Sequence, residues 1–495
     1  MHNQFDFSNP SRQSYVAILI IIFKTVRIIF SRIWPIIIVV FLGKSDPEDE
    51  ESYFLAGMIV LAILVMIISL INYFYTYFFV QDGALQLRKG VFSRKSINIP
   101  FERIQTINFE QNLIHSMFDV VSLKMDTAGS DQTEFEFYAL SKSKANALRN
   151  LILEQKSDDM PLTEEQQQIR PEQQETNIFT LPPGRLMKVG LSQNHLRSVG
   201  LIMLFFFWIF EKLQEAGVAI EEYQGKIPKK DFSVEILLFA TIFFLSISVL
   251  ISMFRTTFKY FNLRFIRSDK GFKIISGLFT RRELAASDQK IQIILWTDNL
   301  LKKQLKYVDL TLKQASSEQI NQAETIRVPG VSIQEVYLVM QKLYPGFTLD
   351  EIYPKKVSKK YFERFATIIS IIGLIISGLL VYLSEWQYSI ISLFVLMILL
   401  ISRYLQYKKL SYALHLDVLY LSGGAWGSKT TLLPVYKIQG VRLNQSPYQR
   451  KHNLATLFCF TASGTVKIPY ILKHEATALM NQILFKVESS KSKWM

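Results

Sequence analysis

The feature of this sequence that most constrains its fold is a motif that occurs three times. Each copy begins with a glycine, reaches an aromatic residue two positions later, carries a basic-Ile-Gln triplet and ends at an alanine. The aligned copies run, without a gap, from Gly90 to Ala128, from Gly277 to Ala315 and from Gly424 to Ala462. Each copy follows a pair of apolar stretches. Self-similarity on this scale indicates a repeated structural unit, and we predict three units, each a membrane hairpin followed by a small domain.

The composition combines basic and hydrophobic character. The 495 residues carry a formal net charge of +14, and 49% of them are hydrophobic. A basic soluble protein would suggest a nucleic-acid partner, but a soluble core does not need the uncharged run from Phe54 to Val80. About 20 apolar residues span a bilayer, so this run predicts a membrane helix, and we expect no nucleic-acid partner. The single cysteine, Cys459, excludes a disulfide within the chain and a multi-cysteine metal site.

The apolar stretches predict six membrane helices in three pairs. The pairs cover residues 15–80, 196–255 and 361–407. Lys24, Arg27 and Arg32 interrupt the first stretch, and the helical period of about 3.6 residues places them on one face. An amphipathic helix in the membrane plane and one long tilted span both fit this pattern. The third candidate, Ser198 to Phe210, is short and needs flanking cations that extend to the interface.

The charges that flank these stretches predict the orientation. The turn inside the first hairpin, Gly43 to Ser52, is strongly acidic, and Glu385 is the charged residue in the turn of the third. Lysines and arginines lie instead at the outer ends of the third pair. Because cytoplasmic loops carry the excess of Lys and Arg, we expect both termini and all three repeat domains in the cytoplasm.

After each pair of apolar stretches the hydrophobic pattern changes to alternation, which is typical of β-strands. The three predicted domains cover residues 74–156, 255–345 and 407–487. In the first, Asp82-Gly83 between alternating segments predicts a β-hairpin. Each domain is expected to have about seven short strands and a closing helix. Residues 157–185, between the first domain and the second hairpin, are rich in Glu and Gln and predict a flexible linker.

The order of these elements, with a Pro-x-x-basic-Ile-Gln segment between strands, resembles the bacterial pleckstrin-homology-like domain. The resemblance is carried by Pro100 to Gln105 and by Pro434 to Gln439, whereas the second copy has Ser287 in place of the proline. The whole chain resembles multi-span bacterial membrane proteins with several such domains. The resemblance implies membrane helices in the bacterial inner membrane and three cytoplasmic domains, each a seven-stranded, partly open barrel with a C-terminal helix. It implies no reaction.

No catalytic constellation is evident in the sequence. The histidines lie in unrelated positions, without a His-Glu-x-x-His motif or a pairing with Cys459. The segment Gly423 to Lys429 is rich in glycine, but it lacks the spacing of a phosphate-binding loop and coincides with a turn in the other copies. We therefore predict that the protein is not an enzyme and uses no metal and no cofactor.

The candidate site residues are cations that recur in the motif or lie in its basic loops. They are Lys95, Arg103, Arg282, Lys290, Lys302, Lys303, Lys429, Lys437, Arg450 and Lys451. One interpretation is that they cover ordinary solvated strand faces. The other is that they form a basic rim that meets anionic lipid headgroups, where each cation contributes on the order of 1 kcal/mol. The loop Asn112 to Asp119 of the first copy has no Lys or Arg, so the second and third copies are the expected lipid-facing domains.

The expected function is that of a non-enzymatic membrane scaffold that binds protein partners or anionic lipid. Envelope maintenance or resistance to membrane-active compounds is its expected setting, and another membrane protein is its expected partner. The alternative is a component of a lipid or small-molecule export system. Transporters usually mark their pathway with ionisable residues or broken helices, and the clean spans contain no Asp, Glu, Lys or Arg. The scaffold interpretation is therefore favoured.

Overall fold

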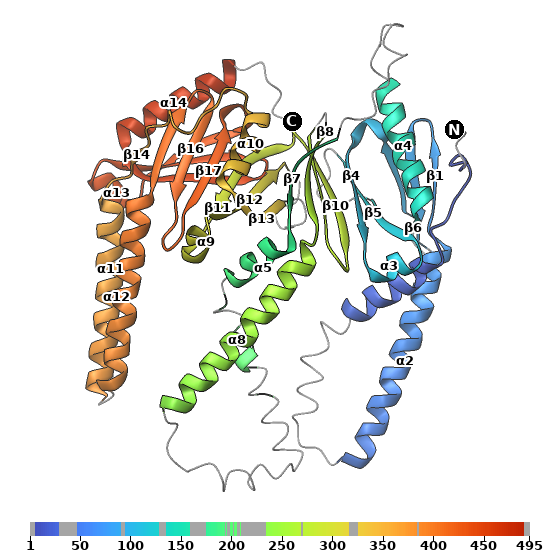
Figure 1. Cartoon of the computed structure of the whole chain (residues 1–495), viewed down its shortest axis with the longest axis horizontal. Coiled ribbons are helices and arrows are strands. Elements are labelled where there is room, and N and C mark those ends of the chain that lie inside the picture. The colour runs from blue at the N-terminus through green and yellow to red at the C-terminus, as the bar shows by residue number, and fades with distance from the viewer. Residues whose placement is uncertain are drawn as a thin grey trace. The chain divides into compact units, whose positions relative to one another are not determined.

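The computed structural model describes residues 5–28, 47–90, 95–127, 135–158, 175–193, 195, 199–200, 202–204, 208, 234–268, 271–315, 325–383 and 386–489. The chain forms two compact units, whose elements are labelled in Figure 1. Unit 1 comprises Met1–Thr176 with Phe272–Ile275 and Phe279–Ala285. Unit 2 comprises Asn177–Gly271, Ser276–Leu278 and Ala286–Met495. The second repeat therefore contributes strands to both units.

Unit 1 contains the first repeat, which is built from two sheets. The first sheet consists of β1 (Tyr77–Gln81), β2 (Ala84–Lys89) and β3 (Lys95–Pro100), and the second of β4 (Ile104–Gln111), β5 (Val120–Thr127) and β6 (Phe135–Ser141). The helix η1 (Phe101–Arg103) joins the sheets, and α4 (Lys142–Asp158) closes the repeat. Asp82 and Gly83 adopt positive φ angles of 52° and 68° in the β1–β2 turn, as the predicted hairpin requires. Leu123, Phe137 and Leu148 are buried in the core of this repeat.

The second sheet of unit 1 continues into strands of the second repeat. Strand β4 pairs antiparallel with β10 (Arg281–Ser287), with Glu110 opposite Arg282. Strand β9 (Gly271–Ser276) lies next to β10, so the order within unit 1 is β6-β5-β4-β10-β9. Two consecutive repeats therefore share a sheet.

Helix α2 (Pro47–Phe74) leads into unit 1 and ends beside its second sheet. Tyr73, at the end of α2, packs in a small core with Ala139. A further helix, over residues 16–28, carries Lys24, whose Nζ lies 2.8 Å from the carboxylate of Glu136 on β6. An ion pair with a β-strand belongs outside the hydrocarbon layer, so this helix fits the amphipathic alternative better than the tilted span.

Unit 2 contains most of the second repeat and the whole third repeat. The second repeat contributes β7 (Thr176–Leu181), α5 (Pro183–Leu191), α8 (Val234–Lys259), β8 (Leu263–Ser268), β11 (Ile291–Thr297), α9 (Leu300–Gln304), β12 (Tyr307–Gln314), β13 (Ile326–Ser332) and α10 (Ile333–Leu343). The third contributes β14 (Lys355–Lys356), α11 (Lys360–Tyr382), α12 (Trp386–Lys409), β15 (Ser411–His415), β16 (Val418–Gly423), β17 (Lys429–Pro434), η4 (Val435–Lys437), β18 (Gly440–Asn444), α13 (Pro447–Lys451), β19 (Leu454–Thr461), β20 (Gly464–Leu472) and α14 (Lys473–Ser489).

Seven strands of unit 2 form one antiparallel sheet in the order β13-β12-β11-β17-β16-β15-β14. The family resemblance implied a seven-stranded, partly open barrel within each domain. A seven-stranded sheet is present, but it joins two repeats instead. The reason lies in β11, where Ile293, Ile294, Leu295 and Trp296 are apolar on both faces. Ile293 packs into the core of the third repeat beside Leu433. A strand that is apolar on both faces requires cover on both faces, and the neighbouring repeat provides it.

Part of the segment assigned to the flexible linker, 157–185, is instead structured. Residues 176–181 form strand β7, in which Phe179 and Leu181 are buried. The ring of Phe179 stacks on that of Phe265 in β8, with 5.0 Å between centroids. The Glu/Gln-rich composition of the segment obscured this short apolar alternation. Residues 159–174 lie outside the described residues.

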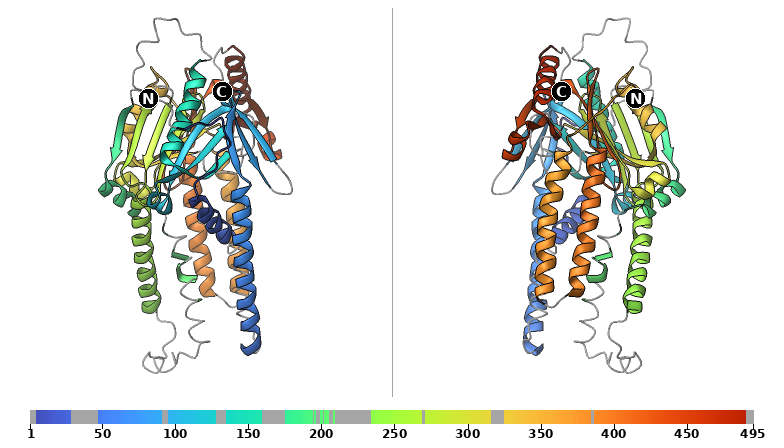
Figure 2. Two further views of the ribbon diagram at one scale, coloured as in Figure 1. Left: turned by 90° about the vertical axis from the view of Figure 1, so that its right-hand side faces the viewer. Right: turned by 90° about the vertical axis from the view of Figure 1, so that its left-hand side faces the viewer.

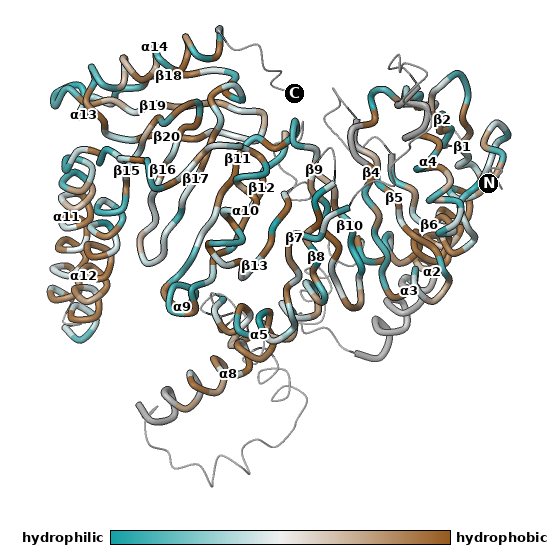
Figure 3. Tube along the Cα trace, turned by 45° about the horizontal axis from the view of Figure 1, so that its top comes forward, coloured by the Kyte–Doolittle hydropathy of each residue, from teal (hydrophilic) through white to brown (hydrophobic). Residues whose placement is uncertain are grey.

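Among the described residues, three helices are long and apolar enough to cross a membrane, and all three are in unit 2. They are Thr241–Lys259 within α8, Lys360–Tyr382 and Trp386–Lys409. Val60–Phe74, in α2, is a shorter apolar helix. The six predicted spans are therefore supported only in part, and most of the third candidate, Ser198 to Phe210, lies outside the described residues. Within unit 2, α8, α11 and α12 leave the β-rich part on the same side (Figure 2), and hydrophobic residues cover much of their length (Figure 3).

Candidate membrane-facing surface

The ends of the membrane helices in unit 2 are bonded to β-hairpin turns. Lys409, the last residue of α12, donates from Nζ to two carbonyls of the β16–β17 turn, at 2.8 and 2.7 Å. The backbone N–H of Leu278 donates to the carbonyl of Phe258 near the end of α8, at 2.9 Å. The β16–β17 turn also carries the exposed Trp426, at the repeated aromatic position of the motif. Tryptophan is enriched at membrane–water interfaces, so this turn suits the level of the lipid headgroups.

A one-turn helix lies after the first strand of the second sheet in each repeat. These three contact helices are α3 (Leu113–Met117), α9 and α13. A side chain at the same position of the motif caps each one: Asn112, Asn299 or Ser446. The cap satisfies a backbone N–H at the helix start, which matters because so short a helix is unstable by itself.

Contact helix α9 is held next to membrane helix α8. The Nδ2 of Asn299 donates to the carbonyl of Ser192, just after α5, at 2.5 Å. Helix α5 in turn accepts a hydrogen bond from α8, from Ser252 Oγ to the Gly190 carbonyl at 3.3 Å. A Cβ at Gly190 would lie 2.5 Å from the Cα of Met253. Glycine therefore lets α5 lie directly on α8, and α9 is held close to α8.

The outer surface of α9 is both apolar and basic. Leu300, Leu301 and Leu305 are 56%, 49% and 37% exposed. Lys303 and Lys306, beside them, are also exposed. Leucines and lysines together suit the boundary between headgroups and acyl chains, where the leucines leave water and the lysines meet negative charge.

The third residue of each contact helix is polar and buried, and it ties the helix to the sheet. These residues are His115, Lys302 and Gln449. His115 Nε2 lies 2.8 Å from the Tyr138 carbonyl, Lys302 Nζ 2.5 Å from the Asp309 carboxylate, and Gln449 Nε2 2.7 Å from Thr456 Oγ1. Each repeat therefore uses a different polar pair at the same place.

Contact helix α13 lies next to the start of α11. Arg364 of α11 donates from Nη1 to Ser446 Oγ at 3.2 Å, and its guanidinium lies 5.2 Å from the ring centroid of Tyr448. Arg450 and Lys451 are exposed on α13. The surface of α13 is therefore mainly basic, whereas that of α9 combines leucines with lysines.

Contact helix α3, in unit 1, presents apolar residues without cations. Leu113, Met117 and Phe118 are exposed, and Met117 is 80% exposed. The segment Asn112 to Asp119 contains no Lys or Arg. The first repeat therefore differs from the other two in the chemistry of its contact helix.

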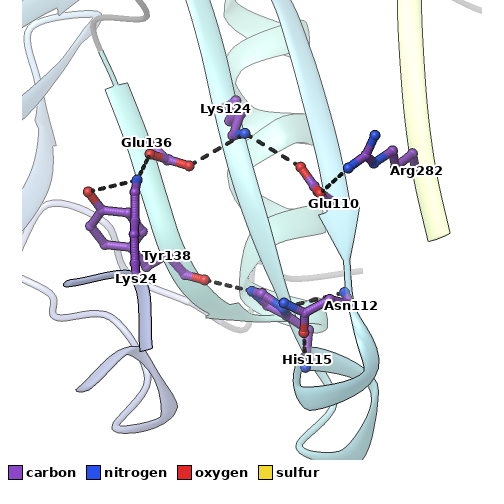
Figure 4. Close-up of polar contacts among 8 residues, drawn as sticks. All are labelled: Lys24, Glu110, Asn112, His115, Lys124, Glu136, Tyr138 and Arg282. Atoms are coloured by element: carbon purple, nitrogen blue, oxygen red, sulfur yellow. Dashed lines mark hydrogen bonds and ion pairs between the residues drawn. The ribbon is translucent and has the colours of Figure 1, made fainter. Parts of the chain in front are cut away.

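A row of alternating charges runs from the helix over residues 16–28 across β6, β5, β4 and β10, as shown in Figure 4. In order, the row consists of Lys24, Glu136, Lys124, Glu110 and Arg282, with neighbours 2.8, 3.5, 3.4 and 3.0 Å apart. Burial raises the pKa of Glu110, but Arg282 and Lys124 lower that pKa by more, so that the net shift is downward. Glu110 therefore remains ionised, and it links the first repeat to β10.

The structure separates the predicted cations by burial. Arg103, Arg282, Lys303, Lys429, Arg450 and Lys451 are exposed, whereas Lys290, Lys302 and Lys437 are buried. The side chain of Lys95 lies outside the described residues. The three buried lysines cannot contribute to an exposed rim.

The exposed cations do not all lie near the contact helices. Arg103 precedes β4, whose other end leads into α3. A strand of eight residues is about 26 Å long, so Arg103 lies far from the contact helix of its repeat. Lys303, Lys429, Arg450 and Lys451 remain as the basic part of the surface in unit 2. The leucines of α9 were missed by the sequence analysis, although an Asn or Ser cap at one motif position in every copy is a signal for these helices.

The burial of Lys437 leads us to expect a specific pH dependence of the protein's stability. Burial lowers its pKa to about 8 from the ordinary value of 10.5, and its Nζ donates to the carbonyl of Gln289. Between these pH values the unfolded chain holds a proton that folded Lys437 has released, so stability should rise with pH in this window. We expect Lys437→Met to remove that rise. Thermal unfolding of both proteins in detergent from about pH 8 to about pH 10 measures it, and equal slopes would contradict the assignment.

Each of the three repeats is a two-sheet module that follows apolar helices and is closed by a C-terminal helix. This arrangement defines a class of membrane protein with repeated PH-like domains. The chain belongs to the family described as Bacterial PH domain, whose model matches residues 18–156, 218–344 and 365–486. It is 23% identical over 480 residues to the UPF0699 transmembrane protein YdbT of Bacillus subtilis (strain 168), covering 91% of this chain and 92% of that protein. No solved structure matches the chain. The predicted resemblance is thereby confirmed.

Proposed function

We propose that this protein is a non-enzymatic membrane scaffold whose second and third PH-like domains rest on the anionic surface of the bilayer through α9 and α13. The observation that carries the proposal is the exposure of Leu300, Leu301 and Leu305 beside Lys303, on a helix held next to α8. Each cation near an anionic leaflet contributes about 1 kcal/mol, and buried apolar area about 25 cal/mol per Å². A domain that is already tethered needs only a few such contacts to stay docked.

The proposal includes the predicted topology. Six spans in three pairs would place both termini and all three domains on the cytoplasmic side of the bacterial inner membrane, as the acidic turn Gly43 to Ser52 and the flanking lysines favour. The relative from Bacillus subtilis is described as a transmembrane protein, which supports a membrane location. The uncharged apolar surface of α3 is the part of the scaffold suited to a membrane-protein partner.

If α9 faces the lipid, a fluorescent probe attached to α9 should report a less polar environment when the protein is in a membrane. In the full-length protein in nanodiscs, a polarity-sensitive fluorophore on Leu301→Cys should shift to the blue and be quenched by brominated lipid, more strongly with anionic than with zwitterionic lipid. Thr465→Cys is the matched control, because Thr465 is exposed at the start of β20, beside the end of β19 that lies away from α13. Cys459 should not react, since burial raises its pKa to about 12. If the probe at Leu301 behaves like that at Thr465 in both lipids, the proposal is wrong.

A further inference from the structure

The two junctions between consecutive repeats use the same pair of strands in the same register. In unit 1, β4 of the first repeat pairs with β10 of the second, with Glu110 opposite Arg282. In unit 2, β11 of the second repeat pairs with β17 of the third, with Thr297 opposite Lys429. Glu110 and Thr297 occupy one motif position, and Arg282 and Lys429 another. The junction is therefore a repeated interface, which each repeat makes with the next.

In the part of the chain that the structure describes, two strands correspond to these junction strands but have no junction partner. Strand β3 is the first-repeat counterpart of β10 and β17, and β18 is the third-repeat counterpart of β4 and β11. Their sheets have the orders β1-β2-β3 and β18-β19-β20, so among the described residues each ends its sheet. An edge strand presents a row of backbone N–H and C=O groups that can pair with another chain.

We propose that copies of this protein associate head to tail, with β18 of one copy adding antiparallel to β3 of another. Repeating the register of the two internal junctions places Asn444 opposite Lys95 and Arg442 opposite Ile97. The surfaces that meet are different, so the interface is heterologous and generates rings or open rows of copies. This inference does not depend on lipid binding by the contact helices.

The outward residues of β18 suit such a junction. Arg442 and Asn444 are exposed, whereas Val441 and Leu443 pack against the core of their own repeat. The equivalents of the two outward residues on β4 are Asn108 and Glu110, which are also polar. Asn108 Oδ1 accepts a hydrogen bond from the backbone N–H of Ala285 at 3.3 Å, and Glu110 binds Arg282 at 3.0 Å. Polar residues at these positions are therefore compatible with pairing.

The same junction is also compatible with a membrane. In unit 2, the β11–β17 junction joins two repeats whose helices α8, α11 and α12 leave on the same side (Figure 2). Two copies joined by the same strand pairing would likewise direct their membrane helices into one bilayer. A sheet continued in this way needs no refolding of either copy.

Disulfide cross-linking tests both the pairing and its register. The N–H of Asp298 donates to the carbonyl of Ser428 at 3.0 Å, so the neighbouring pair, Thr297 and Lys429, is a non-hydrogen-bonded pair, in which side chains are closer. Its proposed counterpart is Asn444 and Lys95. We expect Lys95→Cys and Asn444→Cys, on two differently tagged copies in native membranes, to form a disulfide-linked dimer on mild oxidation. A chain with both substitutions should give dimers and higher oligomers.

Leu443→Cys with Lys95→Cys is the register control, because adjacent residues of a strand face opposite sides of the sheet. We expect about tenfold less dimer for this pair, since disulfides form only across a narrow range of geometries. The proposal is wrong if both pairs cross-link equally, if neither pair gives a dimer, or if the disulfide forms only within a single chain. Each substitution alone should give no dimer, because Cys459 is buried.

Discussion

Gly427→Ala is expected to destabilise the folded protein by about 3 kcal/mol, at the upper end of the cost of overpacking. A Cβ at Gly427 would lie 2.0 Å from the Asp298 carbonyl oxygen and 3.0 Å from the Cα of Asn299. Both atoms are backbone, so the clash can be relieved only by moving the end of the β11–β17 junction. The same movement would disturb the cap of α9, because Asn299 provides it. The melting temperature of the purified protein, followed by tryptophan fluorescence, should fall by several degrees.

Gly184→Ala is the matched control for this substitution. Gly184 lies in α5, and a Cβ there would have no heavy atom within 4 Å. Alanine is a better helix former than glycine by about 1 kcal/mol, so this variant should be unchanged or slightly more stable. If Gly427→Ala and Gly184→Ala have the same melting temperature, the β11–β17 contact does not hold the second and third repeats together.

Lys302→Ala is expected to lower the free energy of unfolding by about 3 kcal/mol, whereas Lys303→Ala should change it by less than about 0.5 kcal/mol. Lys302 is buried, and its removal leaves the carboxylate of Asp309 without its partner at 2.5 Å. Lys303 is exposed on the outer side of the same helix. Denaturant unfolding of the two variants measures the difference.

The two lysines should also separate stability from membrane contact. Lys303→Ala should reduce the response of a probe at Leu301 to anionic lipid while leaving the melting temperature unchanged. A double variant, Lys302→Ala with Asp309→Ala, should recover part of the lost stability, because no charge is then left without its partner. Equal destabilisation by Lys302→Ala and Lys303→Ala would show that the buried ion pair contributes nothing specific.

Much of the fold was predictable because its signals are local. The glycine turns, the alternating strands and the closing helices recur in the same order in each copy, and Asp82-Gly83 forms the expected hairpin. The family resemblance carried by Pro100 to Gln105 is confirmed by the family match. The sharing of sheets was not predicted, although the apolar run at residues 293–296 indicates a strand buried on both faces.

The candidate site was predicted less well because burial isn't a local property. Lys302 and Lys303 are adjacent in one basic loop, yet one is buried against Asp309 and the other is exposed. Lys437 is buried, while Arg103 at the same motif position is exposed. The leucines of α9 were passed over because a leucine in a loop resembles any core residue until its surroundings are known.

The sequence by itself determined that three similar modules exist and that apolar helices precede them. These properties follow from hydrophobic period and turn chemistry, which act between near neighbours. Only the tertiary structure decided that β4 pairs with β10 and β11 with β17, and which lysines are buried. Strand pairing and burial depend on residues far apart in the chain. Any sheet edge offers the same backbone groups, so the partner of an edge strand is selected by which side-chain faces are buried together in the fold.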